Sequence, residues 1–360
     1  MGVFAEVAAS GHEQIVHGYD PVSGLRAIIA IHSTALGPAL GGTRFFNYQS
    51  EADALTDVLR LSQGMTFKAA AAGLDLGGGK AVIIGDPRAL KSERLWRAYG
   101  RLVDSLHGRY ITAEDVGTDH YDMELIRRET PWVTGIPKAE GGSGDPSPAT
   151  ARGLLAALQA VSQHLWGTDD LSTRKVAVQG VGKVGYYFVE DLVQAGCEVL
   201  VGDVYEPAVE RVVEDFGVKA VPPDEILSVA CDVVSPCAMG AVLDSESIPR
   251  LQCPVVLGSA NNQLGGDTHA EALAKQGILY APDFVVNAGG LINVSEELRG
   301  YSVERAARNI DKIYHNLLSV LEAADERGVT PHQAAVTLAE ERIGQIGSLR
   351  LRRRNGKDRN

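Results

Sequence analysis

The chain has 360 residues, and at the ~150 residues of a typical domain this length predicts about two domains. Hydrophobic residues make up 45% of it, which is enough to form packed cores. The formal net charge of -12 disfavours binding to nucleic acid or to an anionic membrane surface and favours a small-molecule substrate. No sequence window approaches the ~18 apolar residues of a membrane span, and the N-terminus lacks a signal-peptide pattern, so we expect a cytoplasmic protein.

The cysteines do not indicate a disulfide framework or a metal site. Their spacing contains no Cys-x-x-Cys pair and no matching histidines, so we expect neither zinc nor another bound metal. The basic residues between 350 and 359 are typical of solvated charge at a chain end, with contact to an acidic partner as the alternative. The cysteines are Cys197, Cys231, Cys237 and Cys253.

The first part of the chain predicts two antiparallel strands followed by alternating helices and strands. Turn-forming residues separate the first two apolar runs, and residues typical of helix N-caps precede the segments in which apolar residues recur at helical spacing. The predicted elements are strands at 13–19 and 25–32, a helix from Ser50 towards Met65, a strand at 81–84 and a helix after Ser92.

Glycine and proline accumulate between 134 and 148, which predicts a hinge or cleft-lining loop and a domain boundary. Beyond it, helices alternate with short apolar strands, which predicts a parallel sheet covered by helices on both faces. The expected fold class is therefore α/β, with an N-terminal α/β domain over 1–140 and a doubly wound domain over 141–325. Residues 326–360 are expected to form a C-terminal helix that packs back on the first domain, followed by the basic tail. The predicted elements after the boundary are helices from Thr150, Gly182 and Pro207, strands at 176–178, 198–201, 233 and 255–257, and two helices within 303–346 separated near 328–331.

A glycine-rich run follows the strand predicted at 176–178 and opens the next helix. Such glycines permit a tight turn, close approach of the backbone to a pyrophosphate and close helix packing. Asp203 ends the following strand, near the ~20-residue separation expected for a carboxylate that binds a ribose. The pattern predicts a Rossmann-type site, against the alternative of structural turn glycines, and the anionic Asp203 without a nearby Arg favours NAD over NADP. The run consists of Gly180, Val181, Gly182, Lys183, Val184 and Gly185.

Lys80 follows three glycines and precedes the strand predicted at 81–84, so its ammonium is expected inside the fold, against the usual alternative of a solvated surface lysine. Lys68, at the end of the helix that follows Ser50, would bring a second ammonium to the same cleft. One ammonium would hold an anionic substrate group, while like charge and burial would lower the pKa of the other into the range useful for general acid and base work. Asp115 would supply the carboxylate that such a site needs. Spacing alone does not establish that these three residues share one site.

Eight short motifs stand in a recognisable order, at 36–44, 64–68, 74–87, 114–118, 144–148, 236–238, 260–263 and 286–290. The segment 74–87 resembles the lysine-centred signature of the glutamate, leucine, phenylalanine and valine dehydrogenase family. The other motifs look like the branch of that family that acts on branched-chain amino acids, such as valine and leucine. The resemblance extends from about residue 11 to residue 342. Lys183 and Ser259 depart from the residues that are frequent in the family, and neither is expected to carry chemistry.

The resemblance implies reversible oxidative deamination of an L-amino acid to a 2-oxo acid and ammonia, with NAD as hydride acceptor and a homo-oligomer assembled through the first domain. Lys68 would hold the substrate carboxylate, Lys80 would act as acid and base, and Asp115 would accept a proton from the amino group. Further contacts are implied to the substrate at Gly41, Gly42 and Asn262, and to the cofactor at Thr150, Cys237, Ala238 and Asn262.

By the same resemblance, the substrate side chain lies in an aliphatic pocket. A glutamate substrate would leave its second carboxylate buried and unpaired there, so glutamate is disfavoured. Valine, leucine and isoleucine are favoured but stay unresolved, because one methylene is worth only ~1–3 kcal/mol. The alternatives are an aromatic amino-acid dehydrogenase on the same scaffold and, less favoured, a non-catalytic NAD-binding protein. The pocket residues are Leu40, Ala113, Leu291 and Val294.

Overall fold

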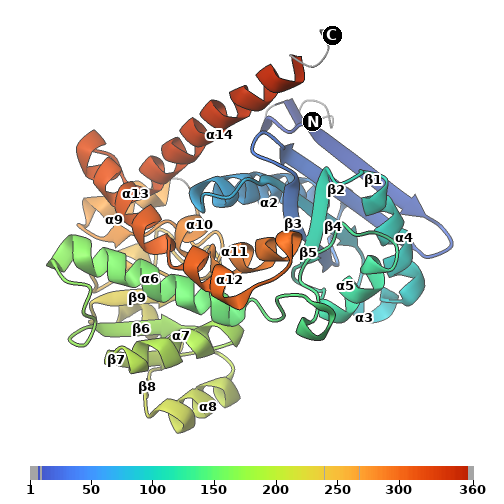
Figure 1. The fold of residues 1–360 in the computed structure, drawn as a ribbon. Coiled ribbons are helices and arrows are strands. Elements are labelled where there is room, and N and C mark those ends of the chain that lie inside the picture. The colour runs from blue at the N-terminus through green and yellow to red at the C-terminus, as the bar shows by residue number, and fades with distance from the viewer. Residues whose placement is uncertain (1–6, 9, 239, 267, 356–360) are drawn as a thin grey trace. The chain divides into compact units, whose positions relative to one another are not determined.

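The computed structural model describes residues 7–8, 10–238, 240–266 and 268–355 (Figure 1). The described chain divides into two compact units, each with its own sheet. The chain leaves and re-enters each unit rather than forming two consecutive segments. Unit 1 draws on Met1–Asp145, Val294–Val303 and Ala339–Asn360, and unit 2 on Pro146–Asn293 and Glu304–Leu338.

Unit 1 contains a mixed sheet whose strands follow the order β1-β2-β4-β3-β5. β1 and β2 pair antiparallel, with Asp20 opposite Leu25 across the predicted turn. β3 runs parallel to both of its neighbours, β4 and β5. The elements are β1 (Gln14–Asp20), β2 (Leu25–Ser33), β3 (Ala39–Phe46), α2 (Glu51–Ala71), β4 (Gly77–Ile84), α3 (Pro87–Leu90), α4 (Glu93–Asp104), β5 (Tyr110–Glu114) and α5 (His120–Arg127).

Helix α2 covers one face of this sheet (Figure 1). It begins at the predicted N-cap Ser50, whose side chain accepts a hydrogen bond from the backbone N–H of Asp53. Its buried residues Ala54 and Val58 pack with the side chains that β2 and β4 place on this face, among them Val82. The contact between the sheet and the N-terminal half of α2 is therefore apolar.

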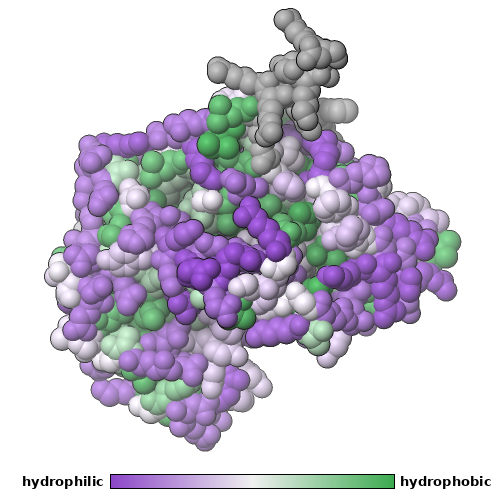
Figure 2. All heavy atoms as spheres, viewed as in Figure 1, coloured by the Kyte–Doolittle hydropathy of each residue, from purple (hydrophilic) through white to green (hydrophobic). Residues whose placement is uncertain are grey.

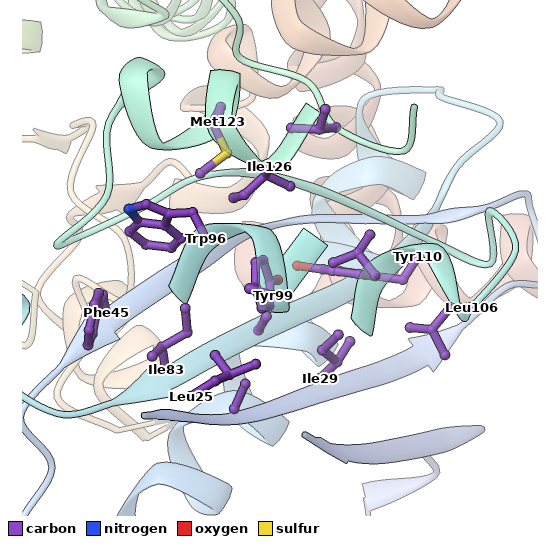
Figure 3. Packing of buried hydrophobic residues seen from close by; sticks show 14 of the residues in the cluster. Leu25, Ile29, Phe45, Ile83, Trp96, Tyr99, Leu106, Tyr110, Met123 and Ile126 are labelled. Carbon is purple, nitrogen blue, oxygen red and sulfur yellow. The ribbon is translucent and has the colours of Figure 1, made fainter. Parts of the chain in front are cut away.

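The opposite face packs on α4 and α5 and holds a large core (Figure 3). Trp96 of α4 lies edge-on to Phe45 of β3, with the ring centroids 5.8 Å apart. The buried hydroxyl of Tyr99 forms a hydrogen bond with Oγ1 of Thr43, so this polar group is satisfied inside the core. Dense packing on this side fixes the strands that carry site residues on the other.

Two boundaries in unit 1 differ from the sequence prediction. α2 continues to Ala71 instead of ending near Met65, because Thr66 and Ala69 in its last turns are also buried. β4 begins at Gly77, so Lys80 lies within the strand instead of before it. The sequence did not predict β3 and β5, because glycines in β3 weaken the alternating pattern and β5 is short.

Unit 2 contains a sheet in the order β11-β10-β9-β6-β7-β8, in which the described strand pairs are parallel. β6 has β7 on one side and β9 on the other, so the strand order reverses there, which is where doubly wound sheets bind ligands. This confirms the predicted α/β class. The elements are α6 (Ser147–Trp166), β6 (Lys175–Gln179), α7 (Lys183–Gln194), β7 (Glu198–Gly202), α8 (Glu206–Phe216), β8 (Lys219–Ala220), β9 (Val233–Pro236), β10 (Val255–Val256), α9 (Thr268–Lys275), β11 (Leu279–Tyr280) and α10 (Asp283–Val286).

The last part of the described chain forms three helices after residue 302 where the sequence predicts two. The predicted break is present, and Gly328 ends the middle helix in the left-handed conformation. Arg342 donates to the carbonyl oxygens of Gly73 and Leu74, which follow α2 in unit 1. The side chains of the basic tail from 350 onward lie outside the described residues. These three helices are α12 (Val303–Ile310), α13 (Ile313–Arg327) and α14 (Pro331–Asn355), and α11 (Gly289–Ser295) precedes them.

Hydrophilic side chains cover most of the molecular face shown in Figure 2, with smaller apolar patches between them. Among the helices that the structure describes, none combines the length and the apolar composition needed to cross a membrane.

Candidate functional site

The register of β3, β4 and β5 brings several predicted site residues to one face of the unit 1 sheet. Leu40 lies beside Gly78 of β4 and Ile111 of β5, and side chains alternate along each strand. Lys80 and Ala113, two residues beyond these partners, therefore project from the same face as Leu40, the face that α2 covers. All three side chains are buried, and Lys80 is only 5% exposed.

Asp115 directly follows β5 and meets Lys80 on this face. Nζ of Lys80 donates to Oδ2 of Asp115 in an ion pair whose side chains are 6% and 17% exposed. The backbone N–H of Val116 donates to Oδ1, and the backbone N–H of Asp115 donates to Oγ1 of Thr118, so the loop holds the carboxylate in place. Burial favours the neutral acid, but Lys80 and Arg44 outweigh burial and lower the pKa of Asp115 to about 2. Asp115 is therefore a carboxylate at neutral pH.

Two glycines of β3 allow the strands to approach closely around this pair. A β-carbon at Gly42 would lie 2.2 Å from the carbonyl oxygen of Glu114 and 3.0 Å from the β-carbon of Asp115. A β-carbon at Gly41 would lie 1.8 Å from the carbonyl oxygen of Gly79. Neither position has room for a side chain, so the predicted substrate-binding glycines also shape the strand beneath the ion pair.

Lys68 lies in the last turn of α2 and is half-buried. The helix packs tightly on β4 near this point, because a β-carbon at Gly78 would lie 2.1 Å from the backbone nitrogen of Thr66. The last turn of α2, which contains Lys68, therefore packs on β4, the strand that contains Lys80. The role of Lys68 in binding a substrate carboxylate stays a prediction.

The loop between β6 and α7 has the close contacts expected of a dinucleotide-binding turn. Gly180 has a φ of 92°, and a β-carbon there would lie 2.6 Å from the β-carbon of Ala238. A β-carbon at Gly185 would lie 2.0 Å from the carbonyl oxygen of Gly180, which is the close helix packing that the motif requires. At Gly182, no heavy atom of the described residues lies within 4 Å of such a β-carbon, so this side of the loop is open.

Asp203 follows β7, and its carboxylate contacts the same loop. Oδ2 accepts a hydrogen bond from the N–H of Val181 at 2.9 Å, and Oδ1 accepts one from the N–H of Tyr205 at 2.9 Å. The structure therefore brings the predicted acid to the predicted glycine-rich run. Its contact with a ribose stays a prediction.

Other predicted cofactor residues lie after β9 and β10 and at the start of α6. The N–H of Cys237 donates to the carbonyl oxygen of Gln179 at 2.7 Å, which ties the end of β9 to the loop after β6. Asn262 has a φ of 53°, a left-handed conformation that non-glycine residues adopt rarely and mostly at special sites. Thr150 lies against α11, because a β-carbon at Gly290 would lie 2.8 Å from its Oγ1.

The last two predicted pocket residues, Leu291 and Val294, are buried about one turn apart on α11. Val294 belongs to unit 1, as Leu40 and Ala113 do, whereas Leu291 belongs to unit 2. A pocket that joins all four residues stays a prediction. Among the described residues, no group of three or more His, Cys, Asp or Glu side chains is arranged to hold a metal ion.

Arg44 contacts the site although the sequence interpretation gave it no role. Its Nε donates to Oδ1 of Asp115 at 3.0 Å, and its Nη1 donates to Oδ2 of Asp57 at 2.9 Å. Arg44 stands two residues after Gly42, so strand alternation would have placed it on the sheet face that carries Lys80. Because the glycines of β3 weaken its apolar alternation, the strand was not predicted. The position of Arg44 on this face therefore could not be inferred from the sequence.

Comparison with known proteins matches two consecutive regions of the chain to family descriptions. The family description "Glu/Leu/Phe/Val dehydrogenase, dimerisation domain" matches residues 12–132, and "Glutamate/Leucine/Phenylalanine/Valine dehydrogenase" matches residues 141–203 and 201–350. The chain is 50% identical over 359 residues to leucine dehydrogenase of Bacillus cereus, covering 99% of this chain and 98% of the relative. It is 51% identical to valine dehydrogenase of Streptomyces virginiae, covering 92% and 94%. The crystal structure of L-tryptophan dehydrogenase from Nostoc punctiforme matches with a TM-score of 0.84 and 44% identity, covering 96% of this chain and 99% of that chain.

Proposed function

Because the chain belongs to the Glu/Leu/Phe/Val dehydrogenase family of amino-acid dehydrogenases, we propose that it catalyses the reversible, NAD-dependent oxidative deamination of a branched-chain L-amino acid. The products are the 2-oxo acid, ammonia and NADH. The observation that carries this proposal is the buried ion pair of Lys80 and Asp115, on the sheet face that also carries Leu40 and Ala113. The enzyme is a cytoplasmic homo-oligomer, and the region matched by the dimerisation-domain description supplies its subunit contacts.

Residues of unit 1 bind the substrate and move its protons. Lys68 pairs with the α-carboxylate, assisted by the backbone at Gly41 and Gly42, and this contact fixes the position of the α-carbon. Asp115 binds the substrate ammonium and accepts a proton from it. Lys80 takes a proton from the water that attacks the substrate iminium and returns one to the nitrogen that leaves as ammonia.

The glycine-rich loop of unit 2 fits a dinucleotide. Gly182 leaves open space where a β-carbon would stand, and α7 begins directly after it, so the positive end of the helix dipole lies beside that space. When bound there, NAD supplies the acceptor for the hydride of the substrate α-carbon. Asp203 binds the ribose hydroxyls and disfavours NADP, because its charge repels a 2'-phosphate. The nicotinamide contacts come from Thr150, Asn262 and the backbone of Cys237 and Ala238.

For the substrate side chain we propose a lining by Leu40 and Ala113 of unit 1, while Leu291 and Val294 are further pocket residues that the family resemblance implies. These residues offer no charge to a γ-carboxylate, so glutamate would bury an unpaired anion. Branched aliphatic side chains fill such a surface without leaving polar groups unpaired. The runner-up substrate class is aromatic, and the 44% identity to a tryptophan dehydrogenase over 96% of this chain is the observation that favours it.

NADH formation by the purified protein, measured with a panel of L-amino acids, tests the proposal. We expect faster turnover of valine, leucine and isoleucine than of phenylalanine and tryptophan, and faster turnover with NAD than with NADP. A dominant aromatic rate would keep the chemistry and overturn the pocket. NAD binding without turnover of any amino acid would favour the non-catalytic alternative.

A further inference from the structure

We propose that Arg44 is a positioning residue for this reaction, which fixes the orientation and the negative charge of Asp115 and is itself held by Asp57 and Tyr48. The proposal rests on the proposed function, in which Asp115 binds the substrate nitrogen. The contacts that carry it lie within unit 1, on β3, on α2, and in the segments that follow β3 and β5.

Arg44 bridges two carboxylates from different elements. Nε donates to Oδ1 of Asp115 at 3.0 Å, and Nη1 donates to Oδ2 of Asp57, a residue of α2, at 2.9 Å. The hydroxyl of Tyr48 donates to the same Oδ2 of Asp57 at 2.5 Å. A planar guanidinium held at two of its nitrogens has little freedom to rotate. Asp57, itself held by Tyr48, therefore fixes the orientation of the guanidinium whose Nε reaches Asp115.

The hydrogen bonds divide the two carboxylate oxygens of Asp115 between different tasks. Oδ1 accepts hydrogen bonds from Arg44 and from the backbone N–H of Val116, and these two bonds restrict rotation of the carboxylate group. Oδ2 accepts from Lys80. Oδ2 is therefore the oxygen beside the proton-exchanging group, and we assign to it the contact with the substrate nitrogen.

Arg44 also supplies a positive charge that the reaction does not remove. Lys80 gives up and regains protons during turnover, whereas a guanidinium stays protonated. Burial disfavours the charge of Arg44, but Asp115 and Asp57 outweigh burial and raise its pKa. Asp115 thus keeps one permanent cationic partner through the cycle.

The cations that pair with Asp115 come from two neighbouring strands. Lys80 reaches it from β4 and Arg44 from β3, and Asp57 of α2 stands behind Arg44. Burial and the hydrogen bond to Asp57 raise the pKa of Tyr48 above its usual range, so its hydroxyl remains a donor. The side chain of the preceding Glu114 instead lies against Gly135.

Another arginine of the same sheet provides a matched control. Arg26 of β2 pairs with Glu51 of α2, but these side chains are 49% and 76% exposed, against 24% and 17% for Arg44 and Asp115. Exposed pairs of this kind are screened by water and contribute little. Arg26→Gln therefore also removes an arginine that links a strand to α2, without touching Asp115.

The test compares the pH profiles of kcat and kcat/KM for L-leucine with NAD in the wild type and in Arg44→Gln, Arg44→Lys and Arg26→Gln. Loss of a cation favours the protonated form of neighbouring acids, so Arg44→Gln is expected to move the acid limb of kcat/KM upward by about one pH unit. We also expect its kcat to fall by about tenfold or more, because the carboxylate loses its orientation. Arg44→Lys is expected to restore the acid limb but only part of kcat, since an ammonium lacks the planar fork. Arg26→Gln is expected to match the wild type.

Each result decides the proposal. A folded Arg44→Gln protein with the kcat and acid limb of the wild type would overturn it, as would an equal effect of Arg26→Gln. If Arg44→Gln fails to fold, Asp57→Asn decides instead: it leaves the charge of Arg44 but loosens the fork, so kcat falls without an upward shift of the acid limb, and an unchanged kcat overturns the proposal. A wild-type protein that oxidises no amino acid would instead refute the proposed function, before any Arg44 variant is compared.

Discussion

Lys80 on β4 and Asp115 directly after β5 form a buried ion pair, although β3 lies between these two strands. The pair spans β3 at the height of Gly42, where a β-carbon would lie 3.0 Å from the β-carbon of Asp115. Because Gly42 has no side chain, Lys80 and Asp115 can meet across β3. Three strands that are distant in sequence must fold into register before the site exists.

Replacement of Lys80 by Ala is expected to lower kcat by about 10²–10⁴-fold, the usual contribution of a positioned acid or base. NAD affinity should change little, because Lys80 belongs to unit 1 and the glycine-rich loop to unit 2. Steady-state kinetics with L-leucine and a fluorescence titration with NAD measure the two quantities. Near-normal turnover in the folded variant would contradict the assigned role.

Gly42→Ala is expected to lower both the melting temperature and the turnover, because the new methyl group would overlap the carbonyl oxygen of Glu114. Gly64→Ala in α2 is the matched control. No heavy atom of the described chain lies within 4 Å of a β-carbon there, and Ala favours a helix over Gly by about 0.5–1 kcal/mol, so this variant should be slightly more stable. Equal melting temperatures and rates for the two variants would show that the close approach at β3 is not needed.

Removal of the charge at position 203 is expected to erode the preference for NAD over NADP by about tenfold or more, since like charges no longer oppose each other. Asp203→Asn removes the charge but keeps an oxygen that can accept from the N–H of Val181. Asp203→Ser shortens the side chain and so loses this contact as well, and the pair of variants separates the effect of charge from that of loop shape. Ratios of kcat/KM for the two cofactors decide the matter, and an unchanged ratio in both variants refutes the assignment.

Ala113→Gly is expected to raise the ratio of phenylalanine to valine turnover, because it removes a buried methyl group from the proposed pocket. One methyl or methylene in such a pocket is worth about 1–3 kcal/mol, so the ratio should rise at least several-fold. Initial rates with both amino acids at subsaturating concentration give this ratio directly. A ratio equal to that of the wild type counts against the pocket.

His32 is expected to make the stability of unit 1 depend on mildly acidic pH. Burial and the neighbouring His12, whose ring centroid is 4.8 Å away, lower the pKa of His32 from 6.5 to about 4. Because the folded value lies below the unfolded one, the unfolded chain takes up the proton first, and stability is lost as the pH falls from 6.5 towards 4. Denaturant unfolding across this window should show a flatter decline for His32→Asn. The same slope in both proteins would exclude this histidine as its cause.

Local sequence patterns were enough to predict those element boundaries that depend only on residues adjacent in the sequence. Ser50 and Ser92 cap helices as predicted, because an N-cap needs only a hydroxyl and the N–H groups that follow it. The strand pairing around Lys80 was harder to predict. Glycines in β3 and β4 remove the apolar alternation that marks a strand, and they are required by contacts with strands far away in the sequence.

The same reason explains how well the site could be predicted. Lys80, Asp115 and Asp203 could be singled out from local sequence patterns, and the structure places each beside a predicted partner, while their roles stay predictions. Arg44 was missed because the glycines of β3 hid its strand, and because its contact with Asp57 exists only once α2 packs on the sheet. Residues that act on a ligand leave a local signature, whereas residues that hold them in place are defined by packing.

The hydrogen bonds of Asp203 to Val181 and Tyr205 have a thermodynamic consequence for the loop after β6. They order this segment during folding, so the loss of its conformational entropy occurs before any ligand arrives. An incoming dinucleotide then meets a turn that is already shaped, and more of its interaction energy appears as affinity. The carboxylate of Asp203 therefore shapes this loop whether or not it also meets the ribose of the proposed dinucleotide.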